Sequence, residues 1–283
     1  MEIIYPDLIA KALQLPLPQV RNTIGLLESG ATIPFISRYR KEMTGGLNEV
    51  QITDVKNWLD KLTELKARKD TILNALEKQE KLTPELKARI ESSWDSNEIE
   101  DIYLPYKPKR VTRAEMARKK GLEPLAKLIA AQKEPFLSGR VPAFVQGEVK
   151  DEEEALSGAR DIIAEWVNEN ERTRNQVRFA FRQAVISAKV IKGKEEEGAK
   201  YRNYFQFEEK LSRCQSHRLL AVRRGEEEGF LRVSIAPADD DACLESLYRQ
   251  YKRNNGACWE QFQLAIDDAY KRLLKPSIES EFA

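Results

Sequence analysis

The feature that most constrains the fold is a helical periodicity that runs from Asn48 to Glu80. Apolar residues recur there at spacings of three and four, with charged residues between them. That spacing places the apolar side chains along one stripe of an α-helix and the charges on the opposite side. The stretch therefore predicts one long amphipathic helix, whose apolar positions are Val55, Trp58, Leu59, Leu62, Leu65, Ile72, Leu73 and Leu76.

The composition extends this prediction to most of the chain. Only 13 of the 283 residues are Gly and 12 are Pro, and the long segments between them are rich in Leu, Ala, Glu, Lys and Arg. These residues lose little conformational freedom on entering a helix. Hydrophobic residues make up 41% of the chain, which is far above the low apolar content of disordered proteins. We therefore predict a mainly α fold, a multi-helical array.

Helix start and stop signals divide the rest of the chain. Residues 1–46 predict short helices in a helix-turn-helix-like unit, because Pro16 and Pro18 favour a helix start and Gly30 a stop. Thr83 and Pro84 begin a helix that ends near Ser92. A T-x-x-E capping box starts another at Thr112. Further helices are expected at 151–170, 174–191, 242–251 and 257–274, the first two as an antiparallel pair.

One stretch has the alternation of a β-strand. Residues 230–235 alternate apolar and polar side chains before Pro237. The fold is therefore expected to contain at most one small β element, near 229–236. We expect two regions, a helical domain at 1–192 and a second helical region at 193–283 that contains this strand.

The balance of charge limits how the chain can bind a polyanion. Its formal net charge is +1, so any contact with nucleic acid must come from cations that cluster locally. No apolar run is long enough to span a bilayer, and the first residues do not resemble a signal peptide. The three cysteines are far apart and form no C-x-x-C pair. A cytoplasmic protein with ordinary thiols is expected, with no contact with membranes.

The first candidate segment, residues 30–46, combines a turn, an apolar wedge and adjacent cations. Arg38, Arg40 and Lys41 lie so close in sequence that on a helix they would point to different sides, and Arg38 could pair with Glu42 four residues on. Ion pairs and stacking between neighbouring helices are the structural interpretation of this segment. Contact of Arg38 and Arg40 with phosphate is the functional one.

The second candidate segment is strongly basic. Residues 107–120 hold seven cations and one acid, a local net charge of +6. Two tyrosines and two prolines at 103–108 stiffen the start of the segment. Backbone phosphates are the simplest partner for such a segment, since cations that displace counterions bind them without reading sequence. Alternatively, Glu98, Glu100 and Asp101 neutralise some of these cations. The nucleic-acid-binding candidates here are Lys107, Lys109, Arg110, Arg113, Arg118 and Lys119.

The third candidate segment, residues 216–226, contains His217, the only histidine of the chain. No Cys or carboxylate stands near it at ligand spacing, and no Ser or Cys elbow accompanies it, so we expect a structural role. Neither glycine-rich phosphate-loop motif occurs in the sequence, which argues against nucleotide hydrolysis. We therefore expect no catalytic residue, no metal and no small-molecule substrate.

These segments together resemble the N-terminal part of the Tex family of bacterial transcription accessory proteins. The resemblance follows the family's order and covers nearly the whole chain. It rests on GATIPFISRYRKEMTGG, EDIYLPYKPKRVTR, GLEPLA, ALSGARDIIAE and HRLLAVRRG, at residues 30–46, 100–113, 121–126, 155–165 and 217–225.

The resemblance implies a function for the intact protein. It implies binding to RNA or DNA without strong sequence preference, association with transcription, no enzymatic activity and no cofactor. It also implies an RNase H-like domain, helix-hairpin-helix elements and an S1 domain of the OB type, which is the part expected to grip nucleic acid. None of these is recognisable here, and we expect the chain to stop before the RNase H-like domain.

Two roles for this region remain open. It could supply a helical accessory surface that contacts nucleic acid through the candidate cations. Alternatively, it could be a protein-interaction scaffold that docks the downstream domains or the transcription machinery and does not itself bind nucleic acid. The balanced net charge and the long amphipathic helices favour the second role, and the basic cluster at 107–120 favours the first.

Overall fold

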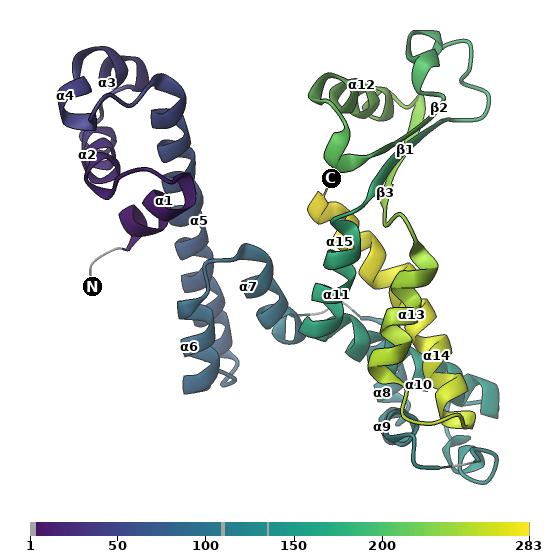
Figure 1. Ribbon diagram of the computed structural model, residues 1–283. Coiled ribbons are helices and arrows are strands. Elements are labelled where there is room, and N and C mark those ends of the chain that lie inside the picture. Colours follow the sequence, from purple (N-terminus) through teal and green to yellow (C-terminus); the bar gives the residue numbers. More distant parts are fainter. Residues whose placement is uncertain (1–3, 109–110, 135, 283) are drawn as a thin grey trace. The chain divides into compact units, whose positions relative to one another are not determined.

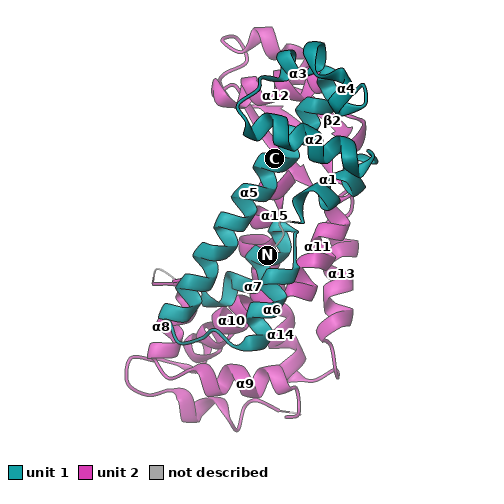
Figure 2. Cartoon of the chain, turned by 90° about the vertical axis from the view of Figure 1, so that its left-hand side faces the viewer, with its two compact units in different colours: residues 1–106 teal, residues 107–283 magenta. Residues whose placement is uncertain are grey.

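The computed structural model describes residues 4–108, 111–134 and 136–282, and its helices and strands are labelled in Figure 1. The mainly α fold is confirmed. The chain forms two compact units, residues 1–106 (unit 1) and 107–283 (unit 2), which Figure 2 distinguishes by colour. The boundary expected at residue 192 falls inside unit 2, directly after a β-strand.

Unit 1 begins with the short helices that its prolines and glycines predict. Pro16 precedes α2, and Gly30 follows that helix with a φ of 86°, a conformation that glycine adopts without steric cost. Helices α1, α2 and α3 all pack on α5. The four short helices are α1 (Tyr5–Leu13), α2 (Leu17–Glu28), α3 (Ile33–Tyr39) and α4 (Lys41–Thr44).

The long helix predicted from the periodicity is confirmed as α5 (Glu49–Lys78). Asn48 and Gln51 close a capping box at its start, which satisfies backbone N–H groups that have no partner inside the helix. The predicted helix after Thr83 is α6, and its end at Ser92 is also confirmed. Unit 1 closes with α6 (Pro84–Ser92), α7 (Ser96–Tyr103) and the 3₁₀ turn η1 (Leu104–Tyr106).

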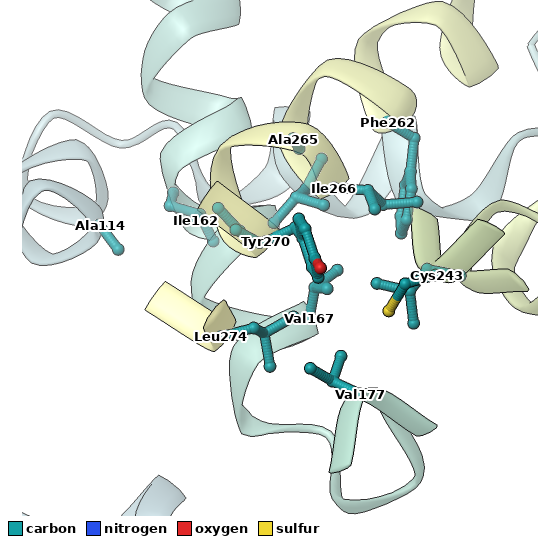
Figure 3. Packing of buried hydrophobic residues seen from close by; sticks show 14 of the residues in the cluster. Ala114, Ile162, Val167, Val177, Cys243, Phe262, Ala265, Ile266, Tyr270 and Leu274 are labelled. Carbon is teal, nitrogen blue, oxygen red and sulfur yellow. The ribbon is translucent and has the colours of Figure 1, made fainter. Parts of the chain in front are cut away.

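Unit 2 is built around a central helix, α10 (Glu152–Glu169), which packs against α8, α9, α11 and α14. Its core includes the buried Tyr270 ring, and Figure 3 shows Ile162 and Val167 of α10 and Ile266 of α14 near it. The other helices of unit 2 are α8 (Arg113–Lys119), α9 (Glu123–Ala131), η2 (Val141–Phe144), α11 (Glu171–Phe181), η3 (Ala199–Tyr204), η4 (Leu211–Arg213), α12 (Ser216–Glu227), α13 (Asp240–Tyr251), α14 (Ala257–Asp268), the π-helical turn η5 (Ala269–Leu274) and α15 (Lys275–Phe282).

The β structure is larger than the sequence predicted. The strand expected near 229–236 is confirmed as β3 (Leu231–Ala236). It pairs antiparallel with β1 (Val185–Val190), which pairs in turn with β2 (Gln206–Lys210), so the sheet order is β2-β1-β3. The helix predicted over 174–191 was therefore wrong beyond Phe181, where α11 ends. Its last residues form β1 because strands from later in the chain supply the hydrogen bonds.

Within the described residues, no helix is long and apolar enough to cross a membrane.

Candidate nucleic-acid interface

Helices α3 and α4 form a small projection, residues 33–44, that we call the α3–α4 tip. Buried Ile36 fixes α3 to a cluster with Leu47 and Ile52. The Asn22 amide donates a hydrogen bond of 2.7 Å to the carbonyl oxygen of Met43, which holds α4 against α2. The contacts of Ile36 and Asn22 thus hold the tip to the rest of unit 1, and the side chains on its other side are exposed.

The chain leaves the helical conformation at Arg40, whose φ is −129° and ψ is 26°. This break separates α3 from α4, so Arg38 and Glu42 do not share one continuous helix. The ion pair that the sequence offered for them is not formed in the described structure. The predicted i, i+4 pair required one continuous helix, and the backbone at Arg40 interrupts it.

The tip exposes two aromatic rings beside its cations. Phe35 is 40% exposed and Tyr39 is 64% exposed, and their ring centroids lie 5.5 Å apart. The Arg40 guanidinium lies 5.3 Å from the centroid of the Phe35 ring. Arg38 and Lys41 are exposed, and among the described residues no carboxylate lies within ion-pair distance of either. Exposed rings can stack on bases while neighbouring cations meet phosphates.

Some cations of the basic segment are paired with carboxylates of unit 2. Thr112 caps α8 by accepting a hydrogen bond from the Glu115 amide, as the capping box predicts. Near the other end of α8, the Arg118 guanidinium lies 2.7 Å from Glu165 of α10, whose side chain is only 9% exposed. Arg118 therefore helps to fasten α8 to α10.

The two following lysines also meet carboxylates. Lys120 lies 2.5 Å from Glu154, a hydrogen bond that raises the pKa of Lys120 and lowers the pKa of Glu154. Lys119 lies 3.2 Å from Glu115 one helical turn away, and its side chain remains 67% exposed. Surface pairs of that kind contribute little and leave the cation accessible.

The other predicted cations differ in their surroundings. Arg113 is exposed at the start of α8, and Lys107 is half-buried. Lys109 and Arg110 lie outside the described residues. Glu100, one of the acids considered as an internal partner, lies 2.6 Å from Arg68 of α5. The structure thus brings Arg113, Arg118 and Lys119 together on one short helix, while Arg38 and Arg40 stand in the other unit.

His217 is exposed near the start of α12. In the described part of the chain no three His, Cys, Asp or Glu side chains are grouped so that they could hold a metal ion.

Two parts of the chain match families of known sequences. Residues 4–77 match the Tex-like protein N-terminal domain and residues 138–280 match the Tex central region-like family, so one match lies in each unit.

Named relatives agree with these matches. The chain is 41% identical to Protein YhgF of Escherichia coli strain K12 over 248 residues, which are 86% of this chain and 32% of that protein. It is 36% identical to the Transcriptional accessory protein Tex of Neisseria gonorrhoeae over 260 residues, 89% of this chain and 34% of the relative. It is 25% identical to human S1 RNA-binding domain-containing protein 1 over 278 residues, 92% of this chain and 28% of that protein.

The chain thus spans about a third of the length of these relatives. Because the Tex central region match alone covers half of the chain, and the N-terminal match precedes it in unit 1, the chain belongs to the Tex family of transcription accessory proteins.

Proposed function

We propose that this chain is part of a cytoplasmic transcription accessory protein that binds nucleic acid, and that the α3–α4 tip contacts a single strand of RNA or DNA. The observation that carries the proposal is the exposed pair of rings, Phe35 and Tyr39, surrounded by the cations Arg38, Arg40 and Lys41. Stacking tolerates any base, and phosphate contacts read no sequence, so the expected binding is unspecific.

The relatives support the choice of partner. One is named a transcriptional accessory protein and another an S1 RNA-binding domain-containing protein. The tip lies in the part of this chain that matches the Tex-like N-terminal domain. We propose that it acts as an accessory contact beside whatever grips nucleic acid elsewhere in the intact protein.

The basic segment enters the proposal through its exposed members. Arg113 and Lys119 are accessible on α8, whereas Arg118 is engaged with Glu165. Lys107, Lys109 and Arg110 precede this helix and are proposed as contacts on the basis of their charge. Replacing Lys109 and Arg110 together with alanine should lower the salt dependence of binding, because two phosphate contacts would be lost.

A salt titration of single-stranded RNA tests the tip. The Arg38→Ala/Arg40→Ala variant of the 283-residue chain should bind a labelled oligouridine more weakly. The slope of log K against log salt should decrease in magnitude by about 1.4, since each lost phosphate contact contributes about 0.7 for a single strand. Tyr39→Ala should weaken binding at every salt concentration without changing the slope, because stacking releases no counterions.

A control variant that removes the same amount of positive charge can be made in unit 1. Lys11 and Lys78 are exposed, and no carboxylate of the described residues pairs with either, so Lys11→Ala/Lys78→Ala removes the same charge away from the tip. An unchanged slope for the tip variant, or an equal loss in the control, would contradict the proposal. Capture of a transcription component that depends on Phe35 and Tyr39, with no RNA binding, would support protein docking instead.

A further inference from the structure

The three-stranded sheet of unit 2 has one face that packs inward and one that points outward. Side chains alternate between the two faces along each strand. Ile186 and Ala188 of β1 are buried, and Glu209 of β2 lies 3.2 Å from Arg218 of α12, so α12 covers the inner face. The outward positions include Ser187 and Lys189, together with the residues paired with them: Gln206, Glu208, Arg232 and Ser234.

On the outer face two cations are directly opposed. Lys189 of β1 pairs across the sheet with Arg232 of β3, and both residues are exposed. Like charges directly opposite each other in a sheet are destabilising. Within the described residues no carboxylate pairs with either side chain, and Glu208 is the single acid at the outward strand positions. The fold therefore keeps two neighbouring positive charges with which no carboxylate of the described residues is paired, while Glu208 stands two residues along β2 from Gln206 on the same face.

The groups beside this pair include hydrogen-bond donors. Gln206 extends the same cross-strand row from β2, and Ser187 and Ser234 form the next opposed pair on the face. An anion placed over Lys189 and Arg232 would relieve their repulsion and accept hydrogen bonds from the hydroxyl and amide groups beside them.

We infer that the outer face of this sheet binds the phosphate backbone of a single nucleic-acid strand, with Lys189 and Arg232 as its phosphate contacts. No outward position of the three strands carries an exposed large hydrophobic residue, and the exposed Ile191 lies just beyond the end of β1, so charged and polar side chains dominate the face between the strand ends. The choice of nucleic acid rests on the proposed function. The need for an anion rests on the opposed charges alone.

The test compares two double variants of the 283-residue chain, each lacking two positive charges of unit 2. Lys189→Ala/Arg232→Ala removes the opposed pair, and Lys133→Ala/Lys271→Ala removes two exposed cations elsewhere. With a labelled oligouridine, the first variant should lose about 1.4 from the salt slope, so between about 50 and 200 mM salt its affinity falls about sevenfold less than that of the unchanged chain. The control should keep the full slope.

The conservative exchange Lys189→Arg/Arg232→Lys should retain both affinity and slope. A single Lys189→Glu variant should lose the slope contribution while its Tm stays the same or rises, because it replaces repulsion by attraction across the sheet. Wild-type binding by Lys189→Ala/Arg232→Ala, or loss of binding by the conservative exchange, would overturn the inference.

The proposed contacts at the sheet and at the tip can be overturned separately. If Arg38→Ala/Arg40→Ala weakens binding and the sheet variant does not, the inference falls and the proposed function stands. If the sheet variant weakens binding and Arg38→Ala/Arg40→Ala does not, the inference about the sheet is supported and the proposed contact at the tip is overturned. If the unchanged chain binds neither single-stranded RNA nor DNA at low salt, both are overturned.

Discussion

At the scale of single residues, neighbouring cations have different roles because of the acids that face them. Arg118 and Lys119 are adjacent on α8, yet Arg118 reaches the buried Glu165 whereas Lys119 points into solvent beside Glu115. Removing a cation that faces a buried carboxylate costs more than removing one from an exposed pair, which is screened by water.

Alanine substitution should separate these two roles. Arg118→Ala should lower the free energy of unfolding by about 1–3 kcal/mol, because the buried carboxylate of Glu165 loses the positive charge that faces it. Lys119→Ala should change it by less than about 0.5 kcal/mol. Urea unfolding followed by circular dichroism measures both, and equal effects from the two variants would show that the contact with Glu165 contributes nothing.

A buried lysine in unit 1 should make stability depend on pH. Lys69 is 4% exposed, donates a 2.9 Å hydrogen bond to the carbonyl oxygen of Glu91, and lies 3.8 Å from the centroid of the Trp94 ring. Burial, assisted by the nearby charge of Lys66, lowers the pKa of the Lys69 ammonium group from its ordinary 10.5.

Proton linkage gives the direction in which the stability changes with pH. Below the lowered pKa both the folded and the unfolded chain carry the proton, and the cost of burying the charge is fully present. Above it the folded chain loses the proton first, so the contribution of Lys69 to stability rises with pH until the unfolded lysine also titrates. As the pH rises toward 10.5, the unfolding free energy of the unchanged chain should therefore rise relative to that of Lys69→Met. The exposed Lys78→Met, on the same helix, should show no such trend, and a constant difference for Lys69→Met would refute the assignment.

At the scale of elements, the distance between a helix and its neighbour decides whether a glycine in that helix can be replaced by a larger residue. Gly225 lies on the face of α12 that meets β3, and a Cβ atom there would stand 2.6 Å from Cδ1 of the buried Leu231. Gly25 lies in α2, and a Cβ atom there would have nothing within 4 Å apart from its own helix backbone and chain neighbours. Both glycines are helical, so alanine gains the same intrinsic helix preference at each.

The two alanine variants should thus have opposite effects. Gly225→Ala should destabilise the chain by about 1–3 kcal/mol, because Leu231 and α12 must shift to relieve the overlap. Gly25→Ala should stabilise it by about 0.5–1 kcal/mol. Thermal unfolding of both variants measures the difference, and a stabilising Gly225→Ala would show that α12 does not pack closely on the sheet.

At the scale of the whole molecule, each unit contains its own hydrophobic core. Among the residues that the structure describes, three buried clusters lie within unit 1 and one large cluster fills unit 2. Each unit therefore buries apolar surface without residues from the other, which is the physical condition for independent folding.

Residues 1–106 alone should form a helical domain that unfolds cooperatively, as measured by circular dichroism during heating. Residues 1–78 should not, because they lack Ile90, Ile99 and Ile102, which cover the second half of α5. An unfolded 1–106 fragment, beside a folded full chain, would show that unit 1 depends on unit 2.

The sequence alone determined the helical character of this protein, because apolar spacing and end caps act between residues at most a few positions apart. The span of α5, the cap at Thr112 and the strand at β3 follow from such local signals. The candidate cations and the family resemblance also came from sequence. Strand β1 could not be predicted, because its hydrogen bonds come from β2 and β3 later in the chain.

Tertiary structure alone decided which cations are engaged and which stay accessible. Arg118 finds Glu165 only because α8 packs on α10, and Lys189 meets Arg232 only through the register of the sheet. The tip exposes Phe35 and Tyr39 because buried Ile36 holds the opposite side of α3. A charge in a sequence has no partner until folding brings distant residues to within a few ångströms, where Coulomb energy and desolvation become large.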